Sequence, residues 1–386
     1  MSAITGYAGY LRSAKCLAAA LLCLQCGLSP AQSRIDADLR ERIVALGPWP
    51  PAPTVDPSNR VSGRPEAIAL GERLFFSAQL SSNGSLLCAS CHETWRHLSD
   101  GRARGHGIGD SNRNTPSVFD VRNKRWYGWD GANDSLWAQS IRPLLDPAEM
   151  GSNPAAIARF VRTDTVLRGA YVNAFGVPPS DEDAAVLADV GKALAAYQET
   201  LDSPATDFDR YRDALARGDV DAARGYPDAA RRGLELFVGK AGCAACHAGA
   251  GFSDGGFHRS LVESRLANGE PDRGRTDGIA KLRANPYRLA GRFNDGPPRQ
   301  EDIGTGEDNN TINRFRTPGL RGVALTAPYM HDGSRISLCE AVQPHATDTE
   351  PATRLAASDA ADLVAFLRTL SAEGAVSLAE DHTACR

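Results

Sequence analysis

Two copies of the pattern Cys-x-x-Cys-His constrain this chain of 386 residues more than any other feature. The first copy occupies residues 88–92 and the second occupies residues 243–247. This spacing is the attachment signature of c-type haem, because two thiols three positions apart can each form a thioether bond to one vinyl group. The adjacent histidine then meets the iron from the same side, so His92 and His247 are the predicted proximal iron ligands.

Paired cysteines have other uses in proteins. A Cys-x-x-Cys pair can be half of a zinc site or a redox-active dithiol. A zinc site would draw both motifs into one four-cysteine cluster and leave both histidines without a role. Two matches in an internally repeated chain favour haem, with thioether bonds from Cys88, Cys91, Cys243 and Cys246.

The two motifs lie in segments that repeat the same order of residues. The first segment runs from GERLF at residues 71–75, through its motif, to SDG at residues 99–101. The second runs from GLELF at residues 233–237, through its motif, to SDG at residues 253–255. The repeat predicts two similar units, each with a short amphipathic helix leading into the cysteine pair.

Helical periodicity dominates the remaining sequence. Apolar residues recur at helical spacing in residues 181–201 and 358–370, and no sustained period-two alternation appears. We therefore expect a mainly α protein of two cytochrome c-like haem domains related by the repeat, with long loops. The expected N-terminal domain covers residues 33–215 and the expected C-terminal domain covers residues 216–386.

The N-terminus has the order of a secretory signal. Arg12 and Lys15 precede an apolar run over residues 16–28, which small and polar residues follow. We expect a cleaved signal peptide of residues 1–32, because the run is too short to span a bilayer comfortably. No later segment is apolar enough to cross a membrane, so we expect the mature protein in the periplasm. The formal charge of −4 gives no support for nucleic-acid or membrane-surface binding.

Two of the nine cysteines lie outside both the motifs and the signal peptide. They are Cys339 and Cys385. In an oxidising compartment these two could form a disulfide that holds the C-terminal tail. The sequence does not show whether their Cα atoms come close enough, so the pairing stays open at this stage.

The ligand in the second axial position of each haem iron determines the function of that haem, and many side chains could occupy this position. For any one of them taken alone, a surface or structural role is the more common one. The candidates in the mature chain are His97, His106, His258, His331, His345, His382, Met150 and Met330.

Five further stretches carry a specific resemblance. They are RNTPSV at 113–118, WDG at 129–131, Gln139, DPAEM at 146–150, and RTPGLRGVALTAPYMHDG at 316–333. Through them the chain resembles the bacterial di-haem cytochrome c peroxidase and MauG superfamily over nearly its whole mature length. The resemblance implies an oxidoreductase in which hydrogen peroxide reacts at the N-terminal haem.

The resemblance also implies catalytic roles for three residues. Trp129 resembles the tryptophan that stands between the two haems and relays electrons. Gln139 and Glu149 resemble the pair over the peroxide-reactive haem, where O–O cleavage needs a proton moved from one peroxide oxygen to the other. Taken alone, Glu149 would be interpreted as a solvated loop carboxylate. Together with Gln139 and Pro143, it is interpreted as a catalytic residue.

A calcium site between the haems is implied in the same way. Asn114 and the carbonyl groups of Thr326 and Pro328 resemble its ligands, and oxygen ligands suit a hard cation. His106 lies in a loop that resembles the one supplying a removable sixth ligand in the peroxidases, whereas MauG-like members keep that haem open. The sequence leaves both states of His106 open.

The chain departs from the family pattern at the second ligand of the C-terminal haem. The peroxidases place a methionine nineteen positions after the threonine equivalent to Thr326, and MauG places a tyrosine there. This chain has His345 at that position. We infer a bis-histidine haem held by His247 and His345, with Met330 or His331 as the alternative ligand. A second imidazole favours the higher oxidation state of the iron.

These features predict an enzyme that oxidises a tryptophan of a partner protein with hydrogen peroxide, through a high-valent di-haem state. His345 adds a narrower resemblance to MbnH-like members, which convert a partner's tryptophan to kynurenine. MauG has a surface tryptophan two positions before its second motif, where this chain has Ala241. The alternatives are a cytochrome c peroxidase fed by a small cytochrome, and a plain electron-transfer cytochrome.

Overall fold

The computed structural model describes most of the mature chain. The predicted signal peptide and His382 lie outside the described residues. The described residues are 36–122, 124–263, 265–297, 309–345, 354–372 and 385.

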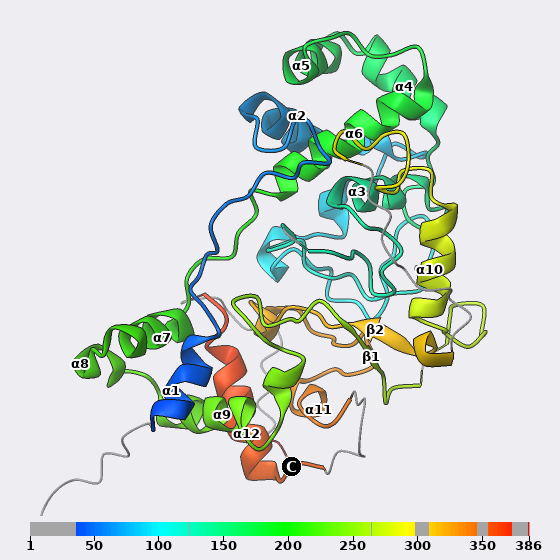
Figure 1. The fold of residues 1–386 in the computed structure, drawn as a ribbon. Coiled ribbons are helices and arrows are strands. Elements are labelled where there is room, and N and C mark those ends of the chain that lie inside the picture. The colour runs from blue at the N-terminus through cyan, green and yellow to red at the C-terminus, as the bar shows by residue number, and fades with distance from the viewer. Residues whose placement is uncertain are drawn as a thin grey trace, which may run out of the picture.

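The described chain is mainly helical, as predicted, and its helices form two groups (Figure 1). The upper group in Figure 1 contains α2 (Pro65–Phe75), α3 (Leu136–Leu145), α4 (Pro154–Thr163), α5 (Thr165–Phe175) and α6 (Asp183–Gln198). The lower group contains α1 (Ala37–Val44), α7 (Asp207–Arg217), α8 (Val220–Ala223), α9 (Asp228–Val238), α11 (Leu338–Ala341) and α12 (Ala357–Arg368). The remaining elements are α10 (Arg275–Ala284) and the antiparallel strands β1 (Phe257–Arg259) and β2 (Arg314–Arg316).

The first hydrophobic core is built around α6. This helix lies within the predicted helical segment 181–201 and is buried on nearly all sides. Its small and apolar residues, including Val186, Val190 and Leu194, explain this, because a helix that is apolar all round is stable only when other helices enclose it. Helices α2, α3 and α4 pack against it.

The second core is formed by α9 and α12, with α1 and α7 beside them. Its buried residues include Ile43 from α1, Phe208 from α7 and Phe366 from α12. The described chain therefore begins in the second core and then crosses to the first (Figure 1). The expected division of the chain after residue 215 stays a prediction.

A close helix crossing occurs in both cores. A Cβ atom added to Gly71 of α2 would collide with the carbonyl oxygen of Ala193 in α6. A Cβ atom added to Gly233 of α9 would collide in the same way with the carbonyl oxygen of Asp362 in α12. Glycine is therefore needed at both crossings for the backbones to approach this closely.

An aromatic pair lies beside each crossing. The ring centroids of Phe75 and Tyr197 are 5.3 Å apart, and those of Phe237 and Phe366 are 5.0 Å apart. In each half the first ring lies four residues after the crossing glycine, on the helix that leads into a Cys-x-x-Cys-His motif. These matched contacts are what the predicted repeat requires, and the duplication itself stays a prediction.

Local sequence sets where several helices begin. Ser135 accepts a hydrogen bond from the backbone N–H of Ala138 at the start of α3. Thr206 and Asp209 form a reciprocal capping box at the start of α7. Such caps satisfy backbone donors that have no partner inside the helix.

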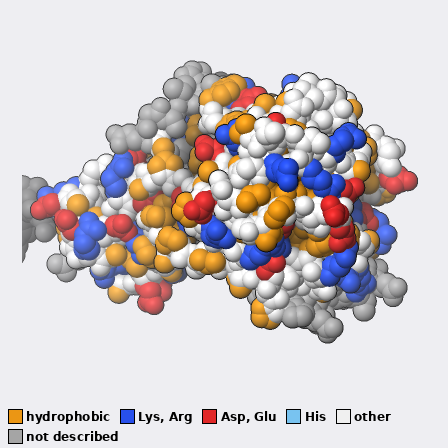
Figure 2. Space-filling view, turned by 90° about the horizontal axis from the view of Figure 1, so that it is seen from above, with side chains coloured by type: hydrophobic (Ala, Val, Ile, Leu, Met, Phe, Trp, Pro, Cys, Tyr) orange, Lys and Arg blue, Asp and Glu red, His pale blue; other side chains and the backbone are white. Residues whose placement is uncertain are grey.

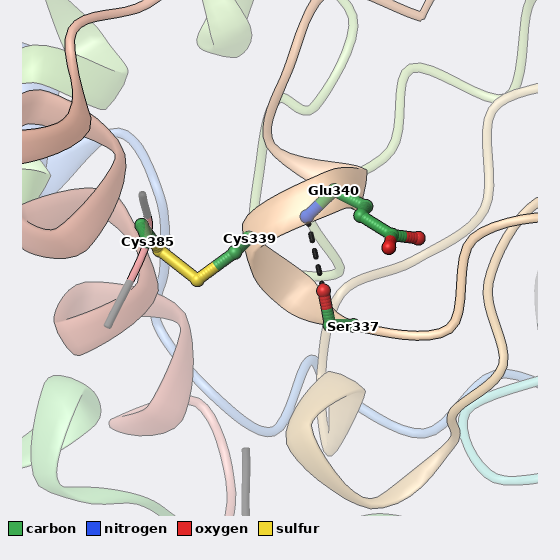
Figure 3. Close-up of a disulfide and its surroundings, with 4 residues drawn as sticks. All are labelled: Ser337, Cys339, Glu340 and Cys385. Atoms are coloured by element: carbon green, nitrogen blue, oxygen red, sulfur yellow. Dashed lines mark hydrogen bonds between the residues drawn. A yellow bond between two sulfur atoms is a disulfide. The ribbon is translucent and has the colours of Figure 1, made fainter. Parts of the chain in front are cut away.

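The structure joins Cys339 and Cys385 in a disulfide (Figure 3), with their Cα atoms 5.2 Å apart. Cys339 lies in α11, whose first turn is capped by the Ser337 hydroxyl accepting from the backbone N–H of Glu340 (Figure 3). The bond links α11 to a residue 46 positions further along the chain. The disulfide reduces the conformational entropy of the unfolded chain and so favours the folded state.

No helix among the described residues is both long enough and apolar enough to cross a membrane. Figure 2 shows basic and acidic side chains interspersed with apolar ones over one face of the molecule.

The helix crossings predict a stability effect. Gly71→Ala and Gly233→Ala should each lower the free energy of unfolding by roughly 1–3 kcal/mol, because the added methyl group forces two backbones apart. Gly169→Ala in α5 is the matched control, since a Cβ there meets nothing within 4 Å. It should be neutral or slightly stabilising. Chemical denaturation of the holoprotein measures all three, and equal values for the three variants would contradict the crossing argument.

A buried carboxyl group predicts a pH dependence. Glu199 accepts a hydrogen bond of 2.7 Å from the Ser62 hydroxyl, and burial raises its pKa to about 7. The folded state therefore holds this proton more tightly than the unfolded state, where the pKa is about 4.3. Its contribution to the free energy of unfolding is complete below that value and is lost as the pH rises towards 7, by roughly 3–4 kcal/mol in total.

Glu199→Gln tests this pH dependence. The variant should lose the decline between pH 5 and 7 and should be more stable than the wild type at pH 8. Glu66→Gln, at an exposed site of α2, should keep the wild-type profile. Denaturant midpoints measured at pH 5 and pH 8 decide between these outcomes.

Candidate functional site

The first Cys-x-x-Cys-His motif follows α2 after a loop that contains one 3₁₀ turn (Ala78–Leu80). Its cysteines frame a single 3₁₀ turn (Cys88–Ser90), and the backbone N–H of His92 donates to the carbonyl oxygen of Cys88 at 3.0 Å. The His92 Nδ1 atom lies 2.9 Å from the carbonyl oxygen of Leu98. A carbonyl can only accept, so Nδ1 carries the proton and Nε2 keeps the lone pair that a metal needs.

The second motif has the same geometry. A 3₁₀ turn (Cys243–Ala245) follows α9, and the His247 Nδ1 atom lies 3.0 Å from the carbonyl oxygen of Phe252. All four motif cysteines are free of disulfides. Within the described residues, the only close group of three potential metal-binding side chains is Cys246 with Asp254 and His258, so the structure does not support a four-cysteine zinc cluster.

A cavity of about 1160 Å³ lies against the second motif. Its walls include Cys243, Cys246 and His247, and also His345 from the far end of the chain. Ligand cavities in proteins are usually about 300–1,000 Å³, so this space is large enough for a group the size of a porphyrin.

His345 faces His247 across this cavity. Their ring centroids are 6.3 Å apart, and the ring planes make an angle of 59°. Two metal–imidazole bonds of about 2 Å each, together with the radius of each ring, fill a separation of this size. The His345 Nδ1 atom lies 3.0 Å from the carbonyl oxygen of Gln343, which leaves Nε2 for a ligand. The pair therefore fits the predicted bis-histidine haem.

Two basic side chains also border the cavity, the partly buried Lys124 and the buried Arg316. Burial lowers the pKa of Lys124 to about 7 and that of Arg316 to about 10. Among the described residues neither forms an ion pair with a carboxylate. Buried charges require a counter-charge, and the two propionate groups of a haem would supply one in this cavity.

The predicted distal residues Gln139 and Glu149 come from α3 and from the loop that follows it. Gln139 accepts a hydrogen bond of 2.8 Å from the Asn133 side chain. Glu149 forms a two-point ion pair with Arg142, with Nη1–Oε1 at 2.8 Å and Nη2–Oε2 at 3.0 Å. Such paired, charge-assisted hydrogen bonds fix the orientation of a carboxylate as well as its position.

Glu149 lies within electrostatic range of the first motif. Burial lowers the pKa of His92, the Glu149 carboxylate opposes this change, and Arg142 adds to it. Burial also raises the pKa of Cys88 to about 12, and Glu149 adds to that increase. The structure therefore brings the predicted distal carboxylate and the predicted proximal histidine into one site.

The loop that carries His106 packs on the backbone beside Glu149. The N–H of Ile108 donates to the carbonyl oxygen of Glu149 at 3.0 Å. The His106 ring is half-exposed, and its Nδ1 atom lies 2.7 Å from a carboxylate oxygen of Asp110. In this arrangement Asp110 holds the His106 imidazole at the surface.

Trp129 borders the cavity of the second motif. Its Nε1–H donates to the carbonyl oxygen of Asn114 at 2.9 Å, and its own carbonyl accepts from the N–H of Arg316 in β2 at 2.9 Å. Its ring also borders the cavity that contains His247 and His345. These contacts hold the indole at the wall of the second haem cavity.

The three predicted calcium ligands also border this cavity. The amide nitrogen of Asn114 donates to the carbonyl oxygen of Pro328 at 3.2 Å and to that of Arg102 at 2.9 Å. Thr326 follows a 3₁₀ turn (Val323–Leu325) in the same segment as Pro328. A cation would require the Asn114 amide to turn its oxygen inward.

Sequence reasoning missed several residues of the site. Arg142 lies one helical turn after Gln139 on α3, a spacing that could have marked it as a neighbour. Lys124 and Arg316 were missed because a buried cation leaves no local sequence pattern. The carbonyl acceptors of Leu98 and Phe252 carry no side-chain signal at all.

Two haem-attachment motifs on two helical cores, with a histidine pair across one cavity, define a di-haem c-type protein. A family model described as di-haem cytochrome c peroxidase matches residues 65–217. The chain is 35% identical to the methylamine utilization protein MauG of Methylorubrum extorquens over 323 residues, 81% of this chain and 80% of that protein. It is 30% identical to the cytochrome-c peroxidase IdrP1 of Denitromonas iodatirespirans, over 94% of each chain.

A solved structure gives the same picture. A MauG-like protein associated with microbial copper homeostasis superposes with a TM-score of 0.63 and 30% identity, over 86% of this chain and 95% of that one. The chain belongs to the family of di-haem cytochrome c peroxidases and MauG proteins. It is a haem-dependent oxidoreductase of the peroxidase type, with two haem groups.

The histidine pair predicts a spectroscopic change. His345→Met should replace the bis-histidine signature of the second haem with that of histidine–methionine ligation, because a thioether then takes the place of an imidazole. His258→Gln, on the wall of the same cavity, should leave the signature unchanged. Near-infrared magnetic circular dichroism of the ferric holoprotein distinguishes the two. A wild-type spectrum from His345→Met would rule out His345 as the ligand.

Proposed function

We propose that this protein uses hydrogen peroxide to oxidise a tryptophan of a partner protein. The observation that carries the proposal is the imidazole of His345 opposite His247, where the peroxidase pattern has a methionine. A second imidazole lowers the potential of the iron and stabilises its oxidised forms. Such a site is a poorer acceptor for electrons from a high-potential cytochrome and a better place to retain oxidising equivalents.

Bound haem would supply the iron at which peroxide is reduced and a store for two oxidising equivalents. Around it, Glu149 is the group that moves a proton between the two peroxide oxygens. Arg142 holds the Glu149 carboxylate from two directions, and Asn133 holds the Gln139 amide. These contacts fix both distal side chains before peroxide arrives, so little reorganisation is needed during the reaction.

Trp129 is the proposed electron relay between the haems. Its indole N–H is fixed by the Asn114 carbonyl, and its ring forms part of the wall of the second haem cavity. The His331 ring lies 6.5 Å from it, and burial lowers the pKa of His331 to about 4. The neighbouring imidazole is therefore uncharged at neutral pH and does not oppose the removal of an electron from Trp129.

The same proposal includes calcium, export and domain organisation. Asn114, with the carbonyl groups of Thr326 and Pro328, would hold a calcium ion between the haems. The signal peptide of residues 1–32 would direct the chain to the periplasm, where haem attachment and the Cys339–Cys385 disulfide are compatible. The matched glycine crossings support two duplicated units, one around each core. The proposed bounds, residues 33–215 and 216–386, leave α1 and most of α7 in the first range although both helices pack in the second core.

A cytochrome c peroxidase that takes electrons from a small cytochrome is the second candidate. The match to a family model of that description and the likeness to IdrP1 favour it. Rapid, sustained peroxide consumption with reduced small cytochrome c would support this candidate over the first. A plain electron-transfer cytochrome would show no peroxide reaction at all.

Glu149→Gln tests the proposed function. Loss of the proton carrier should slow the reaction of the holoprotein with peroxide by roughly 10²–10⁴-fold, while both haems remain attached. Glu66→Gln, at an exposed site of α2, should react at the wild-type rate. Stopped-flow absorbance gives the rates, and near-infrared and Mössbauer spectra show whether a long-lived oxidised state forms. Equal rates for Glu149→Gln and the wild type, or no long-lived oxidised state, would remove the basis of the proposal.

A further inference from the structure

Three of the five tryptophans line one cavity. Trp49, Trp126 and Trp129 all border the cavity between His247 and His345. Because all three indoles border this cavity, each could be oxidised by the haem that the cavity would hold. The proposed function assigns electron transfer between the haems to one of them, Trp129.

A guanidinium group covers two of these three rings. The Arg321 Cζ atom lies 3.7 Å from the centroid of the Trp49 ring. The Arg321 guanidinium is held there by the Asp209 carboxylate, with contacts of 2.8 and 2.9 Å. Trp126 is covered twice, by Arg275 at 4.4 Å and by Arg125 at 5.2 Å.

The two tryptophans away from the cavity are covered as well. The Arg96 Cζ atom lies 4.2 Å from the Trp95 ring centroid, and the Lys192 Nζ atom lies 5.4 Å from that of Trp137. Trp129 differs from the other four. In the described part of the chain, no guanidinium or ammonium group lies over its ring, and its ring neighbour is His331.

A cation over an indole changes how easily the indole loses an electron. The cation is attracted to the electron-rich face of the neutral ring. Removing one electron makes the ring positive, so the attraction becomes repulsion between like charges at about 4–5 Å. The oxidised form therefore rises in free energy relative to the neutral one.

We propose that Arg321, Arg125, Arg275, Arg96 and Lys192 protect four tryptophans from oxidation and so direct oxidising equivalents to Trp129. The proposal rests on the proposed function, in which two electrons and two protons convert hydrogen peroxide to two water molecules. Trp129 gives up one electron at a time, and each electron reduces one of the two oxidising equivalents. The five cations act as positioning residues, and they keep the oxidising equivalents between the haem sites until a partner arrives.

The main test uses the holoprotein with hydrogen peroxide and no partner. An unprotected indole is hydroxylated, so that one peroxide oxygen enters the ring and the other leaves as water. Arg125→Gln should raise hydroxylation of Trp126, per peroxide consumed, about two- to fivefold, as expected for loss of one cation–π contact. Arg125→Lys keeps the charge and should stay near the wild-type level. Peptide mass spectrometry measures each tryptophan separately.

A second position keeps the test independent of the cavity. Arg96→Gln should raise oxidation of the exposed Trp95 in the same way, and Arg96→Lys should not. Arg224→Gln is the matched control, because within the described ranges this exposed arginine pairs with Asp221 and covers no ring. It should leave the oxidation of all five tryptophans unchanged.

A one-electron oxidant generated by light, which bypasses peroxide chemistry, separates the two proposals. One outcome is that tryptophan oxidation by this oxidant depends on arginine charge while peroxide oxidises no variant. That result would contradict the proposed function and support the protection of tryptophans by cations. If neither oxidant shows higher oxidation of Trp126 in Arg125→Gln or of Trp95 in Arg96→Gln, the protection is wrong.

Discussion

The hydrogen bond from a histidine Nδ1–H to a backbone carbonyl is the contact on which the rest of this site depends. His92, His247 and His345 all make it, at 2.9, 3.0 and 3.0 Å. Each bond fixes the tautomer and turns Nε2 towards the position of a metal. Because the acceptors are backbone groups, the fold orients these rings before a haem is attached. The fold therefore presents these three imidazoles at the positions proposed for axial ligands.

The helix crossings lie on the two helices, α2 and α9, that precede the two cysteine motifs. Gly71 and Gly233 let one helix of each core lie directly on a backbone carbonyl of another. The cysteine motif follows a short distance after each crossing, so its turn starts from a fixed point on a rigid pair of helices. Rigid elements hold reacting groups more accurately than mobile loops do. The chain thus uses the same packing solution twice to build two different haem environments.

Positive charge controls the chemistry around both haem positions. Arg142 fixes the Glu149 carboxylate that would move a proton, and Lys124 with Arg316 offers counter-charges to propionate groups. Guanidinium groups cover Trp49 and Trp126, whose oxidation would consume oxidising equivalents before a partner arrives. No guanidinium group among the described residues covers Trp129. In the proposed function, the proton carrier Glu149 and the electron relay Trp129 therefore lie in different charge environments.

Local patterns determined much of this protein. The spacing of Cys-x-x-Cys-His identified the haem sites, and helical periodicity predicted α6 and α12. Counting from Thr326 singled out His345, and the structure places its ring opposite that of His247. These features are readable because each depends on residues at short or fixed separations along the chain.

Only the tertiary structure decided the remainder. Helix α1 packs in the second core although it precedes the first, and Cys385 reaches Cys339 in α11. Arg321 beside Trp49 and Arg275 beside Trp126 come from segments far away in the chain. Contacts of this kind depend on how buried surfaces and charges are matched in space, and no periodicity along the sequence encodes that matching.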